Sequence, residues 1–137
     1  MINKKNSTSN ENEFKDLNDI TYDIIGCAYK VHSELGPGLL ESAYETCLSF
    51  ELKQKGYNIY CQYPVPVIYQ GIKMEAGYRI DILVEDKIVV ELKSVDALAP
   101  IHKAQLLTYL KLANKQLGLL INFNVVDLKE GINRMVL

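Results

Sequence analysis

The chain has 137 residues, of which 48% are hydrophobic and 23% are charged, and its formal net charge is -2. This length fits one domain with a sizeable core, and the composition is typical of a soluble globular protein. The slightly acidic balance excludes a global basic field that would attract a polyanion, although a local basic patch stays compatible with it.

The N-terminal segment differs from the rest of the chain. Residues 1–16 are mostly Asn, Ser, Lys and Glu and have almost nothing to bury, which predicts a disordered polar tail. Residues 17–137 contain no repeat and no internal linker, so we expect them to form a single domain.

Two helices are predicted at the start of this domain. In the first, apolar residues recur at three- and four-residue steps and form one face. These residues are Leu17, Ile20, Ile24, Cys27, Ala28, Val31 and Leu35. A Gly-Pro-Gly sequence at 36–38 predicts the end of this helix, because Gly caps a helix well and Pro cannot continue its hydrogen bonds. The second helix is predicted over about residues 39–55, and its apolar positions are Leu40, Ala43, Tyr44, Cys47, Leu48 and Leu52.

The middle of the chain is predicted to form β-structure. Residues 57–69 are rich in Tyr, Val and Ile, and Pro64 and Pro66 indicate an edge strand or a bulge. We expect the tyrosines of this segment to pack in the sheet rather than to form a platform for nucleic-acid bases. A Gln-Gly pair then predicts a turn, and two further strands are expected at residues 78–84 and 88–93.

The last third of the chain returns to a helix and then to strands. Pro100 is expected in the first turn of a third helix that reaches about Lys115. Residues 118–123 form a short apolar strand, and residues 125–137 predict one or two peripheral strands. The order ααβββαβ predicts an α/β domain in which helices flank a mixed central sheet.

The strands at 78–84 and 88–93 have two different faces, because side chains alternate along a strand. The aliphatic face carries Ile80, Ile82, Val84, Ile88, Val90 and Leu92. The other face carries Arg79, Asp81, Leu83, Val89, Glu91 and Lys93. Pairing the two aliphatic faces requires the two strands to match in parity, for example with Val84 opposite Ile88, and a three-residue loop satisfies this although it lacks glycine.

In that register Asp81 lies opposite Glu91, with Lys93 two residues further along the same face. Opposed side chains approach to about 4.5–5.5 Å at Cβ, so the two carboxylates repel each other unless a cation lies between them. Hard oxygen ligands suit Mg²⁺ or Mn²⁺, and Lys93 would then stand beside a metal-bound water. The alternative is a half-exposed hairpin face that carries plain salt bridges, which so short a pattern also allows.

Two helical positions add polar groups to this pattern. Glu41 lies three residues before Tyr44, so the two share a helix face; the alternative for Glu41 is a first-turn acid that the helix dipole favours. Gln105 lies four residues before Tyr109, and this pair suits a bond to a phosphate or to a metal-bound water. The alternative is an ordinary amphipathic boundary.

The order Glu41, Asp81, Glu91-Leu92-Lys93 and Gln105-x-x-x-Tyr109 resembles the PD-(D/E)XK nuclease superfamily, in its RecB-like, phage-exonuclease-like branch. The sequence GLLESAY is similar to the motif that names the small GxxExxY proteins, and the resemblance covers about residues 17–125. It implies a restriction-endonuclease-like fold. One departure is that Ile80, and not proline, precedes the first acid of the hairpin.

The resemblance implies a role for each residue of the candidate site. Asp81 and Glu91 would bind one Mg²⁺ or Mn²⁺ with help from the backbone carbonyl of Leu92, and Glu41 would complete the metal site directly or through a water. Lys93 would position the attacking water and support the developing negative charge. Gln105 and Tyr109 would hold the scissile phosphate or the attacking water. Arg79, which shares a strand face with Asp81, is a further candidate for a phosphate contact and fits a solvated edge charge equally well.

The leading hypothesis is therefore a metal-dependent nuclease that acts on DNA rather than RNA, with specificity supplied by a partner protein or a homodimer. The alternative is a non-catalytic module of the same fold that binds a protein or nucleic acid; a plain salt-bridged domain is a third. No apolar run approaches the about 20 residues of a membrane span, and the N-terminus is too polar for a secretory signal.

The cysteines and histidines are not expected to belong to the candidate catalytic site. Cys27 and Cys47 fall at apolar helix positions and are predicted core residues; with Cys61 they form no zinc-type spacing, and their odd number predicts reduced thiols in the cytoplasm. His32 is expected to cap carbonyls at the end of its helix, and His102 is expected to be exposed.

Overall fold

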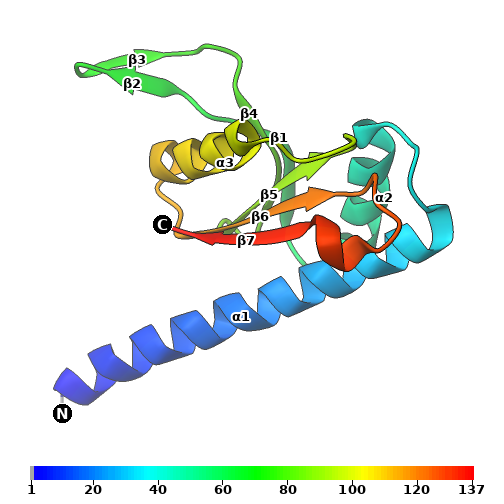
Figure 1. Cartoon of the computed structure of the whole chain (residues 1–137). Helices are drawn as coiled ribbons and strands as arrows, with labels where there is room; N and C mark the ends of the chain where they lie inside the picture. The colour runs from blue at the N-terminus through cyan, green and yellow to red at the C-terminus, as the bar shows by residue number, and fades with distance from the viewer. Residues whose placement is uncertain (1) are drawn as a thin grey trace.

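The computed structural model describes the backbone of residues 2–137 and the side chains of residues 16–137. Figure 1 shows a sheet with helices on both faces and a separate hairpin that extends away from the body. In chain order the elements are α1 (Ile2–Leu35), α2 (Glu41–Gln54), β1 (Ile59–Pro64), β2 (Val67–Tyr69), β3 (Ile72–Met74), β4 (Arg79–Val84), β5 (Ile88–Lys93), α3 (Pro100–Ala113), β6 (Leu117–Asn122), the short 3₁₀ helix η1 (Leu128–Gly131) and β7 (Ile132–Val136).

The five-stranded sheet has the order β1-β4-β5-β6-β7. β5 and β6 are parallel because α3 connects them as a crossover, and the other neighbours are antiparallel. The predicted α/β class with a mixed sheet between helices is confirmed. The predicted order ααβββαβ is incomplete, because the segment 57–69 divides at its prolines into β1 and β2, and the three-residue strand β3 was not expected.

Two hydrophobic clusters cover the two faces of the sheet. The first joins α1 and α2 to the aliphatic face of the central strands; from α1 it takes Leu17, Ile20, Ile24, Cys27, Ala28 and Val31. The second joins α3 to the other face through Leu106 and Leu110. Leu106 packs so closely on β6 that a Cβ at Gly118 would lie 2.8 Å from its Cδ1 atom. Leu35 and Leu40, expected on the apolar helix faces, are exposed because they flank the loop between α1 and α2.

The strand alternation fails at one place in β4. Ile82 and Val84 belong to the cluster under α1 and α2, as expected, but Ile80 packs with Leu83 in the cluster under α3. The expectation that Ile80 shares a face with Ile82 is therefore wrong. The change of face coincides with a distortion of the neighbouring strand, where Gln62 has a left-handed φ of 55°.

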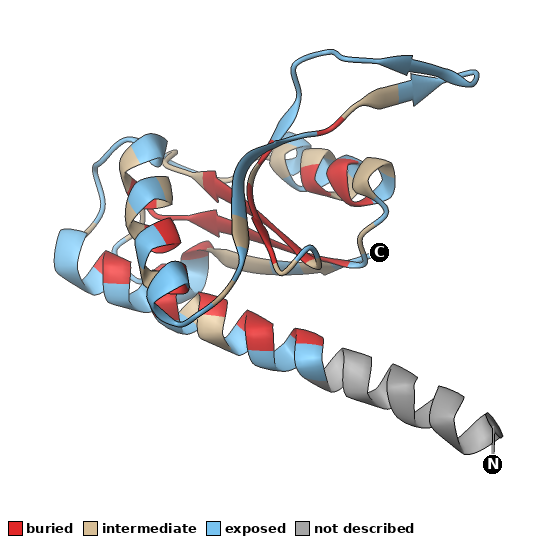
Figure 2. Ribbon diagram, turned by 180° about the vertical axis from the view of Figure 1, so that it is seen from behind, coloured by how far each residue is buried: buried red, intermediate tan, exposed pale blue. Residues whose placement is uncertain are grey.

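Residues 66–77, which we call the arm, carry β2 and β3 and lie outside both clusters. The two strands pair only with each other, and the turn between them lies at Gln70 and Gly71 as predicted. In Figure 2 the arm is coloured mostly as exposed, whereas the central strands are buried. The tyrosines expected to pack in the sheet are exposed at Tyr60, Tyr63 and Tyr69, because β1 is an edge strand and no helix covers the arm.

The segment before Leu17 is drawn as helical backbone that continues α1. A disordered tail was expected over residues 1–16, and the side chains of residues 1–15 lie outside the described part of the chain. The division between a tail and a domain at residue 16 stays a prediction. Among the described residues, no helix combines the length and the apolar character needed to cross a membrane.

Both histidines have roles other than those expected. His32 is buried, and its Nε2 atom lies 2.7 Å from the carbonyl oxygen of Val125, so it joins α1 to the segment after β6 instead of capping its own helix. His102 is half-buried, and its Nδ1 atom accepts a hydrogen bond of 3.0 Å from the backbone amide of Ala99 at the start of α3. The three cysteines are free, and Cys27 is buried as expected.

Candidate active site

The hairpin of β4 and β5 has the register that the sequence predicts. Backbone pairing runs from Val84 opposite Ile88 to Ile82 opposite Val90, which places Asp81 opposite Glu91. The glycine-free turn is formed by left-handed φ values of 54° at both residues 85 and 86. The two acids therefore lie together at one end of these central strands, where β4 begins and β5 ends.

At this end of the two strands, each carboxylate accepts a hydrogen bond from a backbone amide of the opposite strand. Oε1 of Glu91 accepts a hydrogen bond of 3.1 Å from the amide of Asp81, and Oδ2 of Asp81 accepts one of 2.8 Å from the amide of Leu92. Each acid thus bridges to the opposite strand just beyond the last backbone pair. These bonds hold both carboxylates in fixed positions, which a preorganised site requires.

Glu91 is only 4% exposed, whereas Asp81 and Lys93 are half-buried. Burial and the charge of Asp81 raise the pKa of Glu91 to about 8, against the smaller opposing effect of Lys93. Lys93 is the last residue of β5 and lies opposite Asn122 in β6. With this raised pKa, Glu91 is mostly protonated at neutral pH, and the second negative charge of the pair develops only as the pH rises through about 8 or when a cation binds.

A pocket of about 270 Å³ opens on the α2 side of Asp81; its lining residues are Glu41, Ser42, Glu45, Gln62, Asp81 and Leu92. Two of them were missed from the sequence. Nε2 of Gln62 lies 2.6 Å from Oε1 of Glu45 and 3.4 Å from Oδ1 of Asp81, so it bridges the two acids. Burial raises the pKa of Glu45, and the charges of Asp81 and Glu41 add to this effect.

A sequence signal existed for one of the missed residues. Glu45 lies four residues after Glu41, so the two acids share one face of α2. Gln62 had no such signal, because its position beside Asp81 depends on the pairing of β1 with β4 and on its own left-handed backbone.

The start of α2 is held in place by Tyr44. This buried tyrosine donates a 2.6 Å hydrogen bond to the carbonyl of Gly36, and it accepts one of 3.2 Å from the amide of Leu39. Its ring stacks on Phe123 with centroids 4.5 Å apart. A further bond of 2.5 Å joins Oγ of Ser94 to the carbonyl of Leu39. The tyrosine of the GxxExxY motif therefore fixes the loop from which exposed Glu41 projects.

The α3 side of the site contains Tyr109. Burial raises its pKa, and the charges of Glu91 and Asp81 contribute to the shift, so its hydroxyl lies within the field of the two carboxylates. Its ring centroid is 6.3 Å from that of Tyr78. Gln105 is half-buried one turn earlier in α3, and Arg79 is exposed at the first position of β4.

The donor set is made of carboxylates, which suit a hard divalent cation better than a soft one. In the part of the chain whose side chains are described, no group of three or more His, Cys, Asp or Glu residues is close enough to hold a metal ion as it stands. The electrostatic coupling nonetheless links Glu45 to Asp81 and to Glu41, and Glu91 to Asp81. A divalent cation would relieve this mutual repulsion, so the residues present fit such an ion.

Comparison with known proteins gives one match. A family model described as the PD-(D/E)XK nuclease superfamily matches residues 18–135. No curated protein and no solved structure is matched by the chain. The matched residues contain all the acids described above together with Lys93, Gln105 and Tyr109.

Proposed function

Because the chain belongs to the PD-(D/E)XK nuclease superfamily, we propose that it is a Mg²⁺- or Mn²⁺-dependent nuclease that hydrolyses phosphodiester bonds, in DNA rather than RNA. The observation that carries this proposal is the placement of Asp81 directly opposite Glu91, with Lys93 at the end of the same strand. Within the superfamily, the spacing of Gly38, Glu41 and Tyr44 supports a place among the GxxExxY proteins.

Asp81 and Glu91 would hold the metal ion with the backbone carbonyl of Leu92, and Glu41 would reach it directly or through a water. A bound Mg²⁺ or Mn²⁺ would lower the pKa of a coordinated water and stabilise charge on the phosphate. Glu45, which Gln62 already connects to Asp81, is the second acid that α2 offers to this site. Its role would be to orient Gln62 and to add negative charge around the cation.

Lys93 would hold the attacking water and stabilise the negative charge that develops on the phosphate. Tyr109 would donate its hydroxyl proton in a hydrogen bond to a phosphate oxygen or to that water, because its raised pKa keeps it protonated. Gln105 and Arg79 would be further contacts to the phosphate. We place the protein in the cytoplasm, where three free cysteines fit a reducing environment.

A non-catalytic module that binds a protein or nucleic acid is the second candidate. It is favoured by the two backbone hydrogen bonds of Asp81 and Glu91, which give these acids a purely structural use. The net charge of -2 also favours it, since a nuclease must attract a polyanion. The half-exposed Lys93 and the pocket beside Asp81 favour the enzyme.

The test is a cleavage assay on end-labelled single-stranded and double-stranded DNA with Mg²⁺, Mn²⁺ or EDTA. Wild type is compared with Glu91→Gln and with Glu34→Gln, which removes an exposed acid of α1 that does not line the pocket beside Asp81. We expect metal-dependent cleavage by wild type and Glu34→Gln, and a loss of at least about 100-fold in Glu91→Gln. Equal cleavage by Glu91→Gln, or cleavage in EDTA, would contradict the proposed function.

A further inference from the structure

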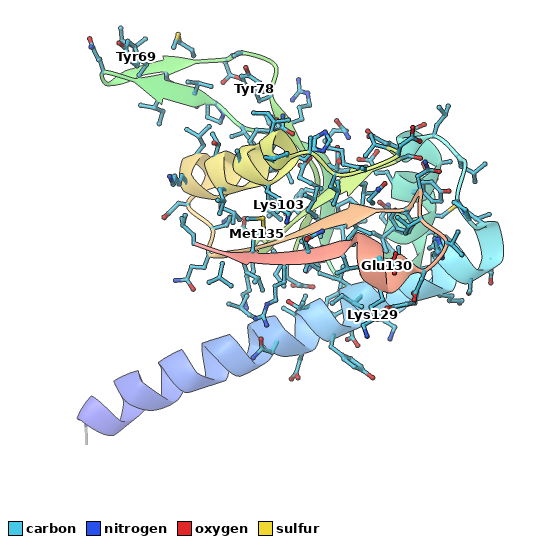
Figure 3. All side chains as sticks on the ribbon, in the orientation of Figure 1. Tyr69, Tyr78, Lys103, Lys129, Glu130 and Met135 are labelled. Atoms are coloured by element: carbon cyan, nitrogen blue, oxygen red, sulfur yellow. The ribbon has the colours of Figure 1, made fainter. Side chains whose placement is uncertain are left out.

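The tyrosines are distributed unevenly over the surface. Four exposed tyrosines lie on β1 and on the arm with its root: Tyr60, Tyr63, Tyr69 and Tyr78 are 53%, 36%, 62% and 48% exposed. Aromatic rings of this size normally contribute to a core or an interface, so a group of them left in solvent indicates a contact surface. Figure 3 shows Tyr69 on the arm and Tyr78 at its root above α3.

The root of the arm adjoins the candidate site. The chain leaves β1 at Pro64 and returns at Arg79, and the amide of Val65 donates a 2.9 Å hydrogen bond to the carbonyl of Tyr78 across the root. The ring of Tyr78 lies 6.3 Å from that of Tyr109, and Tyr109 lies in the field of the carboxylates of Asp81 and Glu91. The exposed ring of Tyr78 therefore lies beside the buried Tyr109, a side chain of α3 on which the charges of the acids act.

One face of the arm is entirely apolar. The cross-strand pairs Val67 with Met74 and Tyr69 with Ile72 place these four side chains together, and three of them are well exposed. A two-stranded hairpin is only marginally stable by itself in water. An arm built in this way is suited to hold a ligand that supplies flat apolar surface.

The charges of the arm and its root are few. Lys73 and Arg79 are its cations, and Nζ of Lys73 lies 3.9 Å from a carboxylate oxygen of Glu75. Non-specific binding of duplex DNA depends on the neutralisation of many phosphates, which this surface does not offer. Binding of a single strand adds base stacking on aromatic rings to its phosphate contacts, and the exposed tyrosines of this surface offer such rings beside Arg79.

We infer that the arm and its root bind a single strand of DNA, with a base stacked on Tyr78, a phosphate on Arg79 and a second base on Tyr69. This inference rests on the proposed nuclease function, since the strand would pass from Tyr78 to Tyr109 and the acids. It names unpaired DNA as the substrate class. A duplex would enter only where its end is frayed, because paired bases do not expose their faces.

The test measures binding by fluorescence anisotropy in EDTA, where a metal-dependent nuclease leaves the probe intact. The probes are a labelled single-stranded oligonucleotide of 20 thymidines and a 20-base-pair duplex, lengths of about the order a single-strand site needs. The variants are Tyr78→Ala, Tyr78→Phe and Tyr22→Ala, the last an exposed tyrosine of α1. Melting temperatures confirm that each variant is folded.

We expect wild type, Tyr78→Phe and Tyr22→Ala to bind the single strand at least about tenfold more tightly than the duplex. Tyr78→Ala should bind the single strand about tenfold more weakly than wild type, because it loses the stacking face while Tyr78→Phe keeps it. Equal or tighter binding of the duplex, unchanged binding by Tyr78→Ala, or no binding of either probe by wild type would overturn the inference.

The two proposals fail in different ways. Metal-dependent cleavage of duplex DNA that is unchanged in Tyr78→Ala would overturn the single-strand inference and leave the nuclease in place. Single-strand binding that depends on Tyr78 without cleavage in any metal would remove the nuclease and leave the binding surface.

Discussion

At the scale of single residues, the opposed acids Asp81 and Glu91 define the site. Their relation could be predicted because strand alternation and the pairing of two aliphatic faces leave one register for the hairpin. What alternation could not predict is the change of face at Ile80, since this depends on the distorted backbone of Gln62 in the neighbouring strand. Gln62 reaches Glu45 from this left-handed backbone, which explains why Gln62 was missed, whereas the spacing of Glu45 from Glu41 was visible in the sequence.

The buried acid gives the metal-free protein a defined pH dependence. The pKa of Glu91 rises on folding from 4.5 to about 8, so the folded state binds a proton that the unfolded state has released between these values. This stabilisation is complete below about pH 4.5 and is lost as the pH rises through about 8.

In EDTA, the free energy of unfolding of wild type should therefore fall between pH 5 and pH 8.5 by an amount on the order of 3 kcal/mol. Glu91→Gln, which stays neutral, should lose most of this fall, whereas Glu34→Gln should keep it. Urea unfolding at several pH values measures the difference. Parallel pH profiles for wild type and Glu91→Gln would show that Glu91 is ionised in the folded protein.

At the scale of elements, the helices and central strands follow from spacing alone, but the arm does not. The strand β3 has three residues and pairs only with β2, so it offers no periodic pattern. Exposure also could not be predicted, because Tyr60 and Tyr69 have the residue type of packed strands and only the sheet order shows that nothing covers them.

Tyr44 holds the start of α2 in place, so its substitution tests how this helix positions Glu41. Its hydroxyl bonds to Gly36 and Leu39, and its ring lies in the core, so we assign it a structural role. Tyr44→Phe should lower the free energy of unfolding by about 1 kcal/mol, because two partly buried hydrogen bonds to the backbone are lost.

The cleavage rate of folded Tyr44→Phe should stay within about threefold of wild type, since the stacked ring still holds the loop before Glu41. Thermal unfolding and the DNA cleavage assay measure the two effects. A loss of cleavage of about 100-fold without a loss of stability would instead show that the Tyr44 hydroxyl takes part in the cleavage reaction.

At the scale of the whole molecule, the sheet separates the two hydrophobic clusters, and the candidate site lies at one end of its central strands. Helices α1 and α2 cover one face and α3 covers the other (Figure 1). Asp81 lines a pocket with the acids of α2, and the charges of Asp81 and Glu91 act on Tyr109 of α3. The arm leaves the sheet at this same end, between the last residue of β1 and the first residue of β4. With a net charge of -2, the proposed affinity for DNA would have to come from local contacts rather than from a global field.

The central claim is that Asp81 and Glu91 together hold a divalent metal ion, and calorimetric titration of Mn²⁺ at pH 8.5 tests it most directly. We expect one Mn²⁺ site in wild type, in Glu34→Gln and in Lys93→Met, and none in Glu91→Gln. Lys93→Met should bind the metal yet cleave DNA at least about 100-fold more slowly, because it loses only the group that stabilises charge. Equal Mn²⁺ binding by wild type and Glu91→Gln, or none by wild type, would contradict the account.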